Sequence, residues 1–114
     1  MMIDWNEYGK QVNSRLGEFS KLTPDTMKGL VTMDRAGEKA NHLGQKVREL
    51  IALAVAVTTR CDACLSAHAR AAVAHGATKE EIAEALGVAV GLNAGAAVVY
   101  SARALDSIAT MTKE

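Results

Sequence analysis

Two cysteines and a histidine lie close together in the stretch TTRCDACLSAHARAA, residues 58–72. Cys61 and Cys64 are three residues apart and are the only cysteines in the chain, and His68 follows four residues after Cys64. If a helix begins near Cys61, both sulfurs and the imidazole share one face of that helix. The free N–H groups and the positive dipole end of such a helix favour a thiolate over a thiol.

These three side chains have the types and the spacing for thiol redox chemistry. An imidazole one turn from a thiol can form an ion pair with the thiolate or carry a proton to and from it. Two sulfurs at this spacing can close a disulfide, so the group fits thiol–disulfide exchange or peroxide reduction. Helix position alone nominates Cys61 as the attacking thiol, whereas the nearer imidazole nominates Cys64. We expect Cys64 to attack and Cys61 to resolve.

Glu49 is a fourth candidate, twelve residues before Cys61 at the polar edge of an apolar segment. A helix, a short turn and a returning helix would bring its carboxylate near the cysteines. There it could accept a proton from a thiol or orient His68. If it is buried beside the apolar run, this carboxylate needs a partner. The alternative is that Glu49 is a solvated charge at the start of a helix.

Other interpretations of the cluster stay open. Cys61, Cys64, His68 and Glu49 also make four possible zinc ligands. Against zinc, structural sites usually take their ligands from two separated segments, and no second CxxC or HxxxH motif is present. The cysteines could also be two small buried residues of a packing helix. We expect the remaining histidines, His42 in a loop and His75 at a helix end, to be structural.

The sequence predicts that all the elements that position these residues are helices in a single small domain, residues 1–114. Apolar residues at spacings of three and four predict an amphipathic helix over about 4–22, and Pro24 after a Thr23 N-cap begins a second helix to about residue 41. That first apolar face comprises Trp5, Tyr8, Val12, Leu16 and Phe19.

The second half of the chain predicts three or four further helices, about five to six in all. The segment 50–57 has no polar residue and predicts a helix buried on nearly all sides, followed by a polar break at 58–60. Gly76 suits the left-handed end of the cysteine helix, and Thr78 with Glu81 forms a capping box. We expect a kink or gap near Asn93, then a last helix to about residue 108. The glycine series suits close helix packing and comprises Gly87, Gly91 and Gly95.

The charge and the residue composition exclude several classes of function. Thirteen basic and thirteen acidic residues balance, and no basic cluster indicates nucleic acid. The start of the chain has no signal-peptide pattern, and no stretch approaches the roughly 20 apolar residues of a membrane span, so we expect a cytoplasmic protein with no membrane contact. Apolar residues make up 49% but aromatic residues only 4%, so each side chain buries little area. This favours further burial between subunits of a homo-oligomer.

The segment RELIALAVAVTTRCDACLSAHARAAVAHGATKEEIAEAL resembles the AhpD-like alkylhydroperoxidases of the carboxymuconolactone decarboxylase superfamily. The shared pattern is a glutamate, eleven residues, CxxC, three residues and a histidine, met here by Glu49, Cys61, Cys64 and His68. The resemblance covers roughly residues 43–105. It implies an all-α, AhpD-like fold that assembles as dimers, trimers or hexamers, and we expect a homotrimer or homohexamer.

The resemblance also implies an enzyme, a thiol peroxidase of the alkylhydroperoxidase or peroxiredoxin type or a disulfide reductase. In that interpretation Glu49 and His68 form a proton relay that generates the reactive thiolate. Cys61 and Cys64 become a disulfide after a hydroperoxide is reduced. A dithiol donor, either a lipoylated or a thioredoxin-like protein, restores them, and no other cofactor is needed.

The sequence departs from the family pattern in two ways. Well-studied peroxidases of the family carry two copies of the helical unit and often a histidine or tyrosine before the second cysteine. This chain has one copy and Ala63 at that position. The decarboxylases of the superfamily lack the CxxC motif. The alternatives are therefore a non-catalytic, redox-sensitive binding or assembly module of the same fold, or a decarboxylase.

Overall fold

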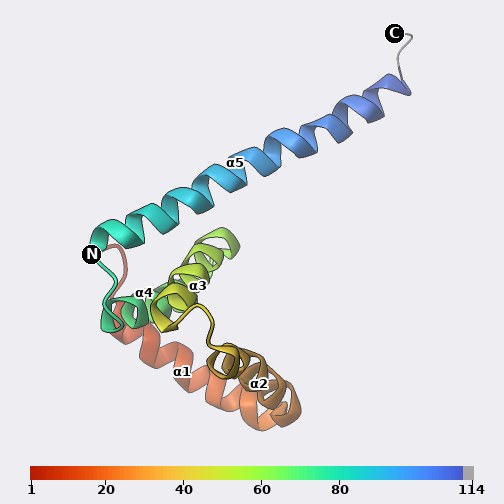
Figure 1. Ribbon diagram of the computed structural model, residues 1–114. Coiled ribbons are helices and arrows are strands. Elements are labelled where there is room, and N and C mark those ends of the chain that lie inside the picture. The colour runs from red at the N-terminus through yellow and green to blue at the C-terminus, as the bar shows by residue number, and fades with distance from the viewer. Residues whose placement is uncertain (112–114) are drawn as a thin grey trace.

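The computed structural model describes residues 1–111, and these form five α-helices with no strand between them (Figure 1). The all-α class is confirmed, with five helices where five to six were expected. In chain order the helices are α1 (Trp5–Leu22), α2 (Pro24–Ala40), α3 (Gln45–Thr59), α4 (Asp62–Ala74) and α5 (Lys79–Ala109).

The junction between α1 and α2 follows the local signals with one difference. Pro24 occupies the first turn of α2, where its missing N–H costs nothing. Thr23 lies at the N-cap position, but its hydroxyl donates to the Phe19 carbonyl of α1 and does not cap α2. At its other end, α2 stops at Asn41, which has a left-handed backbone with φ of 46°. Asparagine tolerates this conformation better than most residues.

The core lies between α3, α4 and the first half of α5, and it is small. The buried apolar residues of the described chain are Leu53, Ala56, Ala72, Ala77 and Ala89. The expectation that 50–57 is buried on nearly all sides is wrong, since Ile51 is 50% and Val55 55% exposed. Within one chain α4 and α5 cover part of α3 and leave these two side chains uncovered.

Two tight connections set the position of α4. Arg60 ends α3 in a left-handed conformation with φ of 56°, and Cys61 then serves as the N-cap of α4. After α4, Gly76 has φ of 91°, which is the left-handed turn expected there. The predicted capping box is confirmed, because the Thr78 hydroxyl accepts from the Glu81 N–H and the Glu81 carboxylate accepts from the Thr78 N–H.

The predicted kink near Asn93 is wrong, because α5 is continuous over 31 residues. The Asn93 amide donates to the Ala89 carbonyl one turn earlier and to the Thr58 hydroxyl on α3. Glycine costs a helix only about 1 kcal/mol relative to alanine, so three glycines do not stop it. A Cβ built on Gly87, Gly91 or Gly95 meets nothing within 4 Å, so none of the other helices in residues 1–111 packs closely there.

Helix α5 extends away from the other four helices (Figure 1). It packs on α3, and beyond Asn93 its residues are exposed. By length and composition it could cross a membrane, although its first turn is acidic. This differs from the sequence expectation that no stretch approaches the roughly 20 apolar residues of a membrane span. Its large exposed apolar residues are Val88, Val90, Leu92, Val98, Val99, Tyr100, Leu105 and Ile108.

Candidate active site

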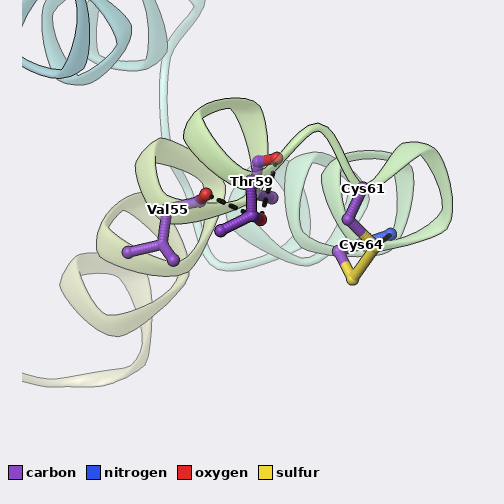
Figure 2. The surroundings of a disulfide bond; sticks show 5 residues. Val55, Thr59, Cys61 and Cys64 are labelled. Carbon is purple, nitrogen blue, oxygen red and sulfur yellow. Dashed lines mark hydrogen bonds between the residues drawn. A yellow bond between two sulfur atoms is a disulfide. The ribbon is translucent and has the colours of Figure 1, made fainter. Parts of the chain in front are cut away.

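A disulfide joins Cys61 and Cys64 at the start of α4, directly after the turn that leaves α3 (Figure 2). The turn is anchored on the α3 side by Thr59, whose hydroxyl donates to the Val55 carbonyl at 3.0 Å. The Cα atoms of the two cysteines are 5.2 Å apart, inside the range that a disulfide bridges. The sequence spacing therefore places the sulfurs close enough to cycle between dithiol and disulfide without moving the helix.

The two cysteines have different surroundings. The Cys61 sulfur is the N-cap acceptor of α4 and receives the Cys64 N–H at 3.2 Å. Cys64 itself is exposed, whereas Cys61 is half-buried. Helix position alone had nominated Cys61 as the attacking thiol, but Cys64 is the more exposed of the two cysteines. After reduction, an N–H donor and the helix dipole would favour negative charge on Cys61, while Cys64 is the sulfur that solutes reach first.

Glu49 and His68 meet across α3 and α4. The Glu49 Oε2 atom lies 2.6 Å from His68 Nδ1, and the side chains are 13% and 40% exposed, respectively. A carboxylate has no proton to donate, so Nδ1 carries the proton. The neutral ring then has its lone pair on Nε2, which is free to accept a proton. His68 follows Cys64 by four residues on α4, one helical turn further along.

The structure thus pairs Glu49 of α3 with His68 of α4, and it joins Cys61 to Cys64 at the start of the same α4. Among the residues it describes, no hydrogen bond or ion pair joins His68 to either sulfur. Within residues 1–111, no three His, Cys, Asp or Glu side chains are grouped as metal ligands. His42 follows α2 on an exposed connection, and His75 is the exposed C-cap of α4.

Sequence reasoning missed two polar residues beside the site, Gln45 and Arg48. The Gln45 amide donates to Glu49 Oε1 at 2.6 Å, and Arg48 donates to the Gln45 carbonyl oxygen at 2.8 Å. The spacing of four between Gln45 and Glu49 on a helix was the available signal.

An open cleft of about 600 Å³ lies between α1 and the first half of α4, and neither cysteine lines it. Ala63, the residue between Cys64 and Asp62, lines it together with Trp5 and Tyr8 of α1. Arg70 also lines the cleft and donates to the Asn6 side-chain oxygen at 3.3 Å. The cleft combines aromatic surface with a cationic group, beside the helix turn that carries the sulfurs.

The family model for the carboxymuconolactone decarboxylase family matches residues 24–107. The chain belongs to this family. The match begins at the start of α2, about twenty residues before the resemblance that the sequence showed over roughly residues 43–105. Three of its five helices and all four candidate residues lie wholly within the matched range, along with most of α5.

Proteins similar to this chain cover most of its length. An uncharacterized protein of Haemophilus influenzae is 49% identical over 107 residues, spanning 94% of this chain and 95% of that protein. An uncharacterized protein of Cupriavidus necator is 32% identical over 95 residues, 83% of this chain and 84% of that one. A crystal structure of the apo form of a carboxymuconolactone decarboxylase family protein from Legionella pneumophila superposes with a TM-score of 0.71 at 34% identity. That superposition covers 96% of this chain and 97% of the other.

Proposed function

We propose that this family member is a CxxC-dependent thiol peroxidase of the alkylhydroperoxidase type. One observation carries the proposal: a Cys61–Cys64 disulfide with Cys64 exposed lies at the start of a helix that also presents His68 to the Glu49 carboxylate. A buried structural disulfide would need neither the exposure of Cys64 nor a carboxylate–imidazole pair one turn away. Together these groups supply a nucleophile, a resolving thiol, a base and an orienting group for that base.

In the first step His68 Nε2 takes the Cys64 proton, and the Glu49 carboxylate stabilises the imidazolium that forms. The Cys64 thiolate attacks the terminal oxygen of a hydroperoxide, the O–O bond breaks, and the alkoxide leaves as an alcohol by taking the imidazolium proton. Sulfur is oxidised to a sulfenic acid and the peroxide is reduced. The cleft between α1 and α4 would accommodate the organic part of the hydroperoxide.

In the second step the Cys61 thiol attacks the sulfenic sulfur, water leaves, and the disulfide forms. An external dithiol then attacks the exposed Cys64 sulfur, and Cys61 departs as a thiolate that the Cys64 N–H stabilises. The second thiol of the donor resolves the mixed disulfide and leaves as a disulfide. The net reaction converts one hydroperoxide and one dithiol into an alcohol, water and a disulfide. A lipoylated or thioredoxin-like protein is the proposed donor, in the reducing cytoplasm.

A disulfide reductase is the second candidate, favoured by the exposure of Cys64. It would use the same two sulfurs with a disulfide in place of the peroxide. The deciding measurement is hydroperoxide consumption with dihydrolipoamide, a thioredoxin and glutathione as donors. We expect turnover with a dithiol, and none in Cys64→Ser. If the disulfide is reduced by these donors but no hydroperoxide is consumed, the peroxidase proposal is wrong and the reductase remains.

We propose further that the protein works as a homotrimer or homohexamer. The support is the apolar surface of α5 and the outer side of α3, which one chain leaves uncovered. Soluble monomers rarely expose large apolar patches, and α5 alone exposes eight large apolar side chains in one chain. Ile51 and Val55 of α3 are part of this surface, so a single membrane-spanning α5 would not account for all of it.

A further inference from the structure

The Glu49 carboxylate is held at both oxygens. Oε2 faces His68 Nδ1 at 2.6 Å, and Oε1 accepts the Gln45 side-chain amide at 2.6 Å. Gln45 lies one turn before Glu49 on α3, so the two side chains extend from the same face of the helix. With two partners on opposite oxygens, the carboxylate has one preferred rotation and points at the imidazole.

Arg48 decides which way round the Gln45 amide lies. Its guanidinium donates to the Gln45 Oε1 atom at 2.8 Å, and a guanidinium can only donate. The Gln45 oxygen must therefore face Arg48, which turns the NH₂ group toward Glu49. This orientation satisfies both hydrogen bonds. In the flipped orientation the Gln45 NH₂ group would face the Arg48 guanidinium, which is also a donor, and the Gln45 oxygen would face the Glu49 carboxylate, which is also an acceptor.

Arg48 in turn is fixed against the end of α2. It donates to the Asn41 side-chain oxygen at 2.9 Å, and Asn41 is the left-handed cap of α2. Its stem passes over Gly37, where an added Cβ would lie 2.8 Å from Arg48 Cδ. The hydrogen bonds thus run without interruption from the C-terminus of α2 through Arg48 and Gln45 to Glu49 and His68.

We propose that Gln45 is a positioning residue for the Glu49–His68 pair and that Arg48, seated on the end of α2, orients it. Gln45 acts through Glu49 and does not contact the reacting sulfurs. This inference rests on the proposed function, in which Glu49 and His68 set the charge on the attacking thiol. Without Gln45 the carboxylate can rotate toward solvent, and the imidazolium formed by proton transfer loses its alignment.

The test uses Gln45→Met, which keeps an unbranched side chain of similar length and removes the amide. The matched control is Gln11→Met, because Gln11 donates to the Glu7 carboxylate one turn earlier on the exposed face of α1 at 3.2 Å. The readout is the pH midpoint of iodoacetamide alkylation of the reduced, folded protein. We expect the midpoint to rise by about half to one pH unit in Gln45→Met, since a Glu49 carboxylate that has lost its alignment stabilises the imidazolium, and with it the thiolate, less well. Gln11→Met should match the wild type.

The outcomes separate this inference from the peroxidase proposal. A raised midpoint in a wild-type protein that consumes no hydroperoxide would retain the role of Gln45 and reject the peroxidase. A lowered or unchanged midpoint in folded Gln45→Met would overturn the role of Gln45, whatever the peroxide result. If hydroperoxide is consumed, kcat should fall roughly three- to tenfold with KM for peroxide unchanged, because Gln45 does not touch substrate.

A second pair of variants tests the connection to α2. Gly37→Ala adds a methyl group that must displace the Arg48 stem, whereas Gly29→Ala on the same helix meets nothing within 4 Å. We expect Gly37→Ala to raise the alkylation midpoint in the same direction as Gln45→Met and Gly29→Ala to leave it unchanged. An unchanged midpoint in Gly37→Ala, with thermal unfolding showing a folded protein, would overturn the anchoring role of α2.

Discussion

At the scale of single residues, the two sulfurs of the CxxC motif are not equivalent. Cys61 is the N-cap of α4 and accepts a backbone N–H, while Cys64 is exposed and lies one turn before His68. A helix start favours negative charge on the sulfur nearest to it, and an imidazole favours charge on the sulfur that it can deprotonate. Access decides between these effects, because a peroxide must reach the sulfur that attacks it.

We therefore predict that Cys61→Ser still forms a sulfenic acid with hydrogen peroxide, trappable by a dimedone-type reagent, and that Cys64→Ser does not. Mass spectrometry of the trapped protein measures the adduct. In His68→Ala on the Cys61→Ser background, the pH midpoint of trapping should rise, because the thiol has lost its base. The reverse pattern, an adduct only in Cys64→Ser, would show that the helix dipole outweighs exposure and the histidine.

Arg60 is the second residue at which the structure predicts the effect of a substitution. It adopts a left-handed backbone with φ of 56° directly before Cys61, which costs a non-glycine residue roughly 1–2 kcal/mol. Arg60→Gly should raise the free energy of unfolding by roughly 1 kcal/mol in urea, less the entropy that glycine adds to the unfolded chain. Arg60→Lys is the control and should unfold like the wild type. A destabilised Arg60→Gly would mean that the arginine side chain contributes more than its backbone costs.

At the scale of elements, one ion pair ties the start of α5 to α3. Lys46 Nζ lies 2.8 Å from Glu81 Oε2, and the same carboxylate completes the capping box of α5. The hydrogen bond from Lys46, followed by the backbone N–H of Thr78, lowers the pKa of Glu81 below its ordinary value of 4.5. A lowered carboxyl pKa stabilises the folded state above the ordinary value, and that contribution disappears as the pH falls through the folded value.

This predicts that acid weakens the attachment of α5. Urea unfolding of the wild type should lose stability as the pH falls below about 4.5, and Lys46→Met should lose less over the same range because its main pKa-lowering partner is gone. Both side chains are more than a third exposed, so salt should reduce the difference between the two proteins. Parallel loss of stability in both proteins would show that other carboxyl groups control the acid response.

At the scale of the whole molecule, a single chain is more extended than a folded domain of its length. Its radius of gyration is 18.8 Å, whereas about 13 Å is typical of a compact chain of 114 residues. The difference comes from α5, which projects beyond the other helices (Figure 1). Glycine and alanine along this helix leave room for a second helix to approach closely. The apolar surface and the extended shape together favour a second copy of the chain as the covering partner.

Light scattering should therefore give a mass that is a multiple of 12.0 kDa at micromolar concentration, three or six chains. Leu92→Glu should lower that mass, because Leu92 is 73% exposed in the lone chain and would lie in the subunit interface. The control is Glu84→Gln, an exposed position on the same helix. A stable 12 kDa monomer would refute the assembly, and flotation with lipid vesicles in place of self-association would assign α5 to a membrane.

The helices and most of their ends could be predicted from the sequence, because these depend on neighbours in the chain. Proline at the start of α2, glycine after α4 and the capping box of α5 act over four residues or fewer. The same holds for the closeness of Cys61 and Cys64, which any helix start ensures at this spacing. Local signals failed at Asn93. The glycines around it predicted a kink or gap, but each glycine costs a helix little, and α5 is continuous there.

Only the tertiary structure decided how the helices face one another. It placed Glu49 against His68, nineteen residues later, and it connected Gln45 and Arg48 to the end of α2. It also showed that α5 and the outer side of α3 stay uncovered in one chain. These features depend on the angle and rotation between packed helices. Those quantities follow from the summed packing of many side chains, and no short-range pattern in the sequence encodes them.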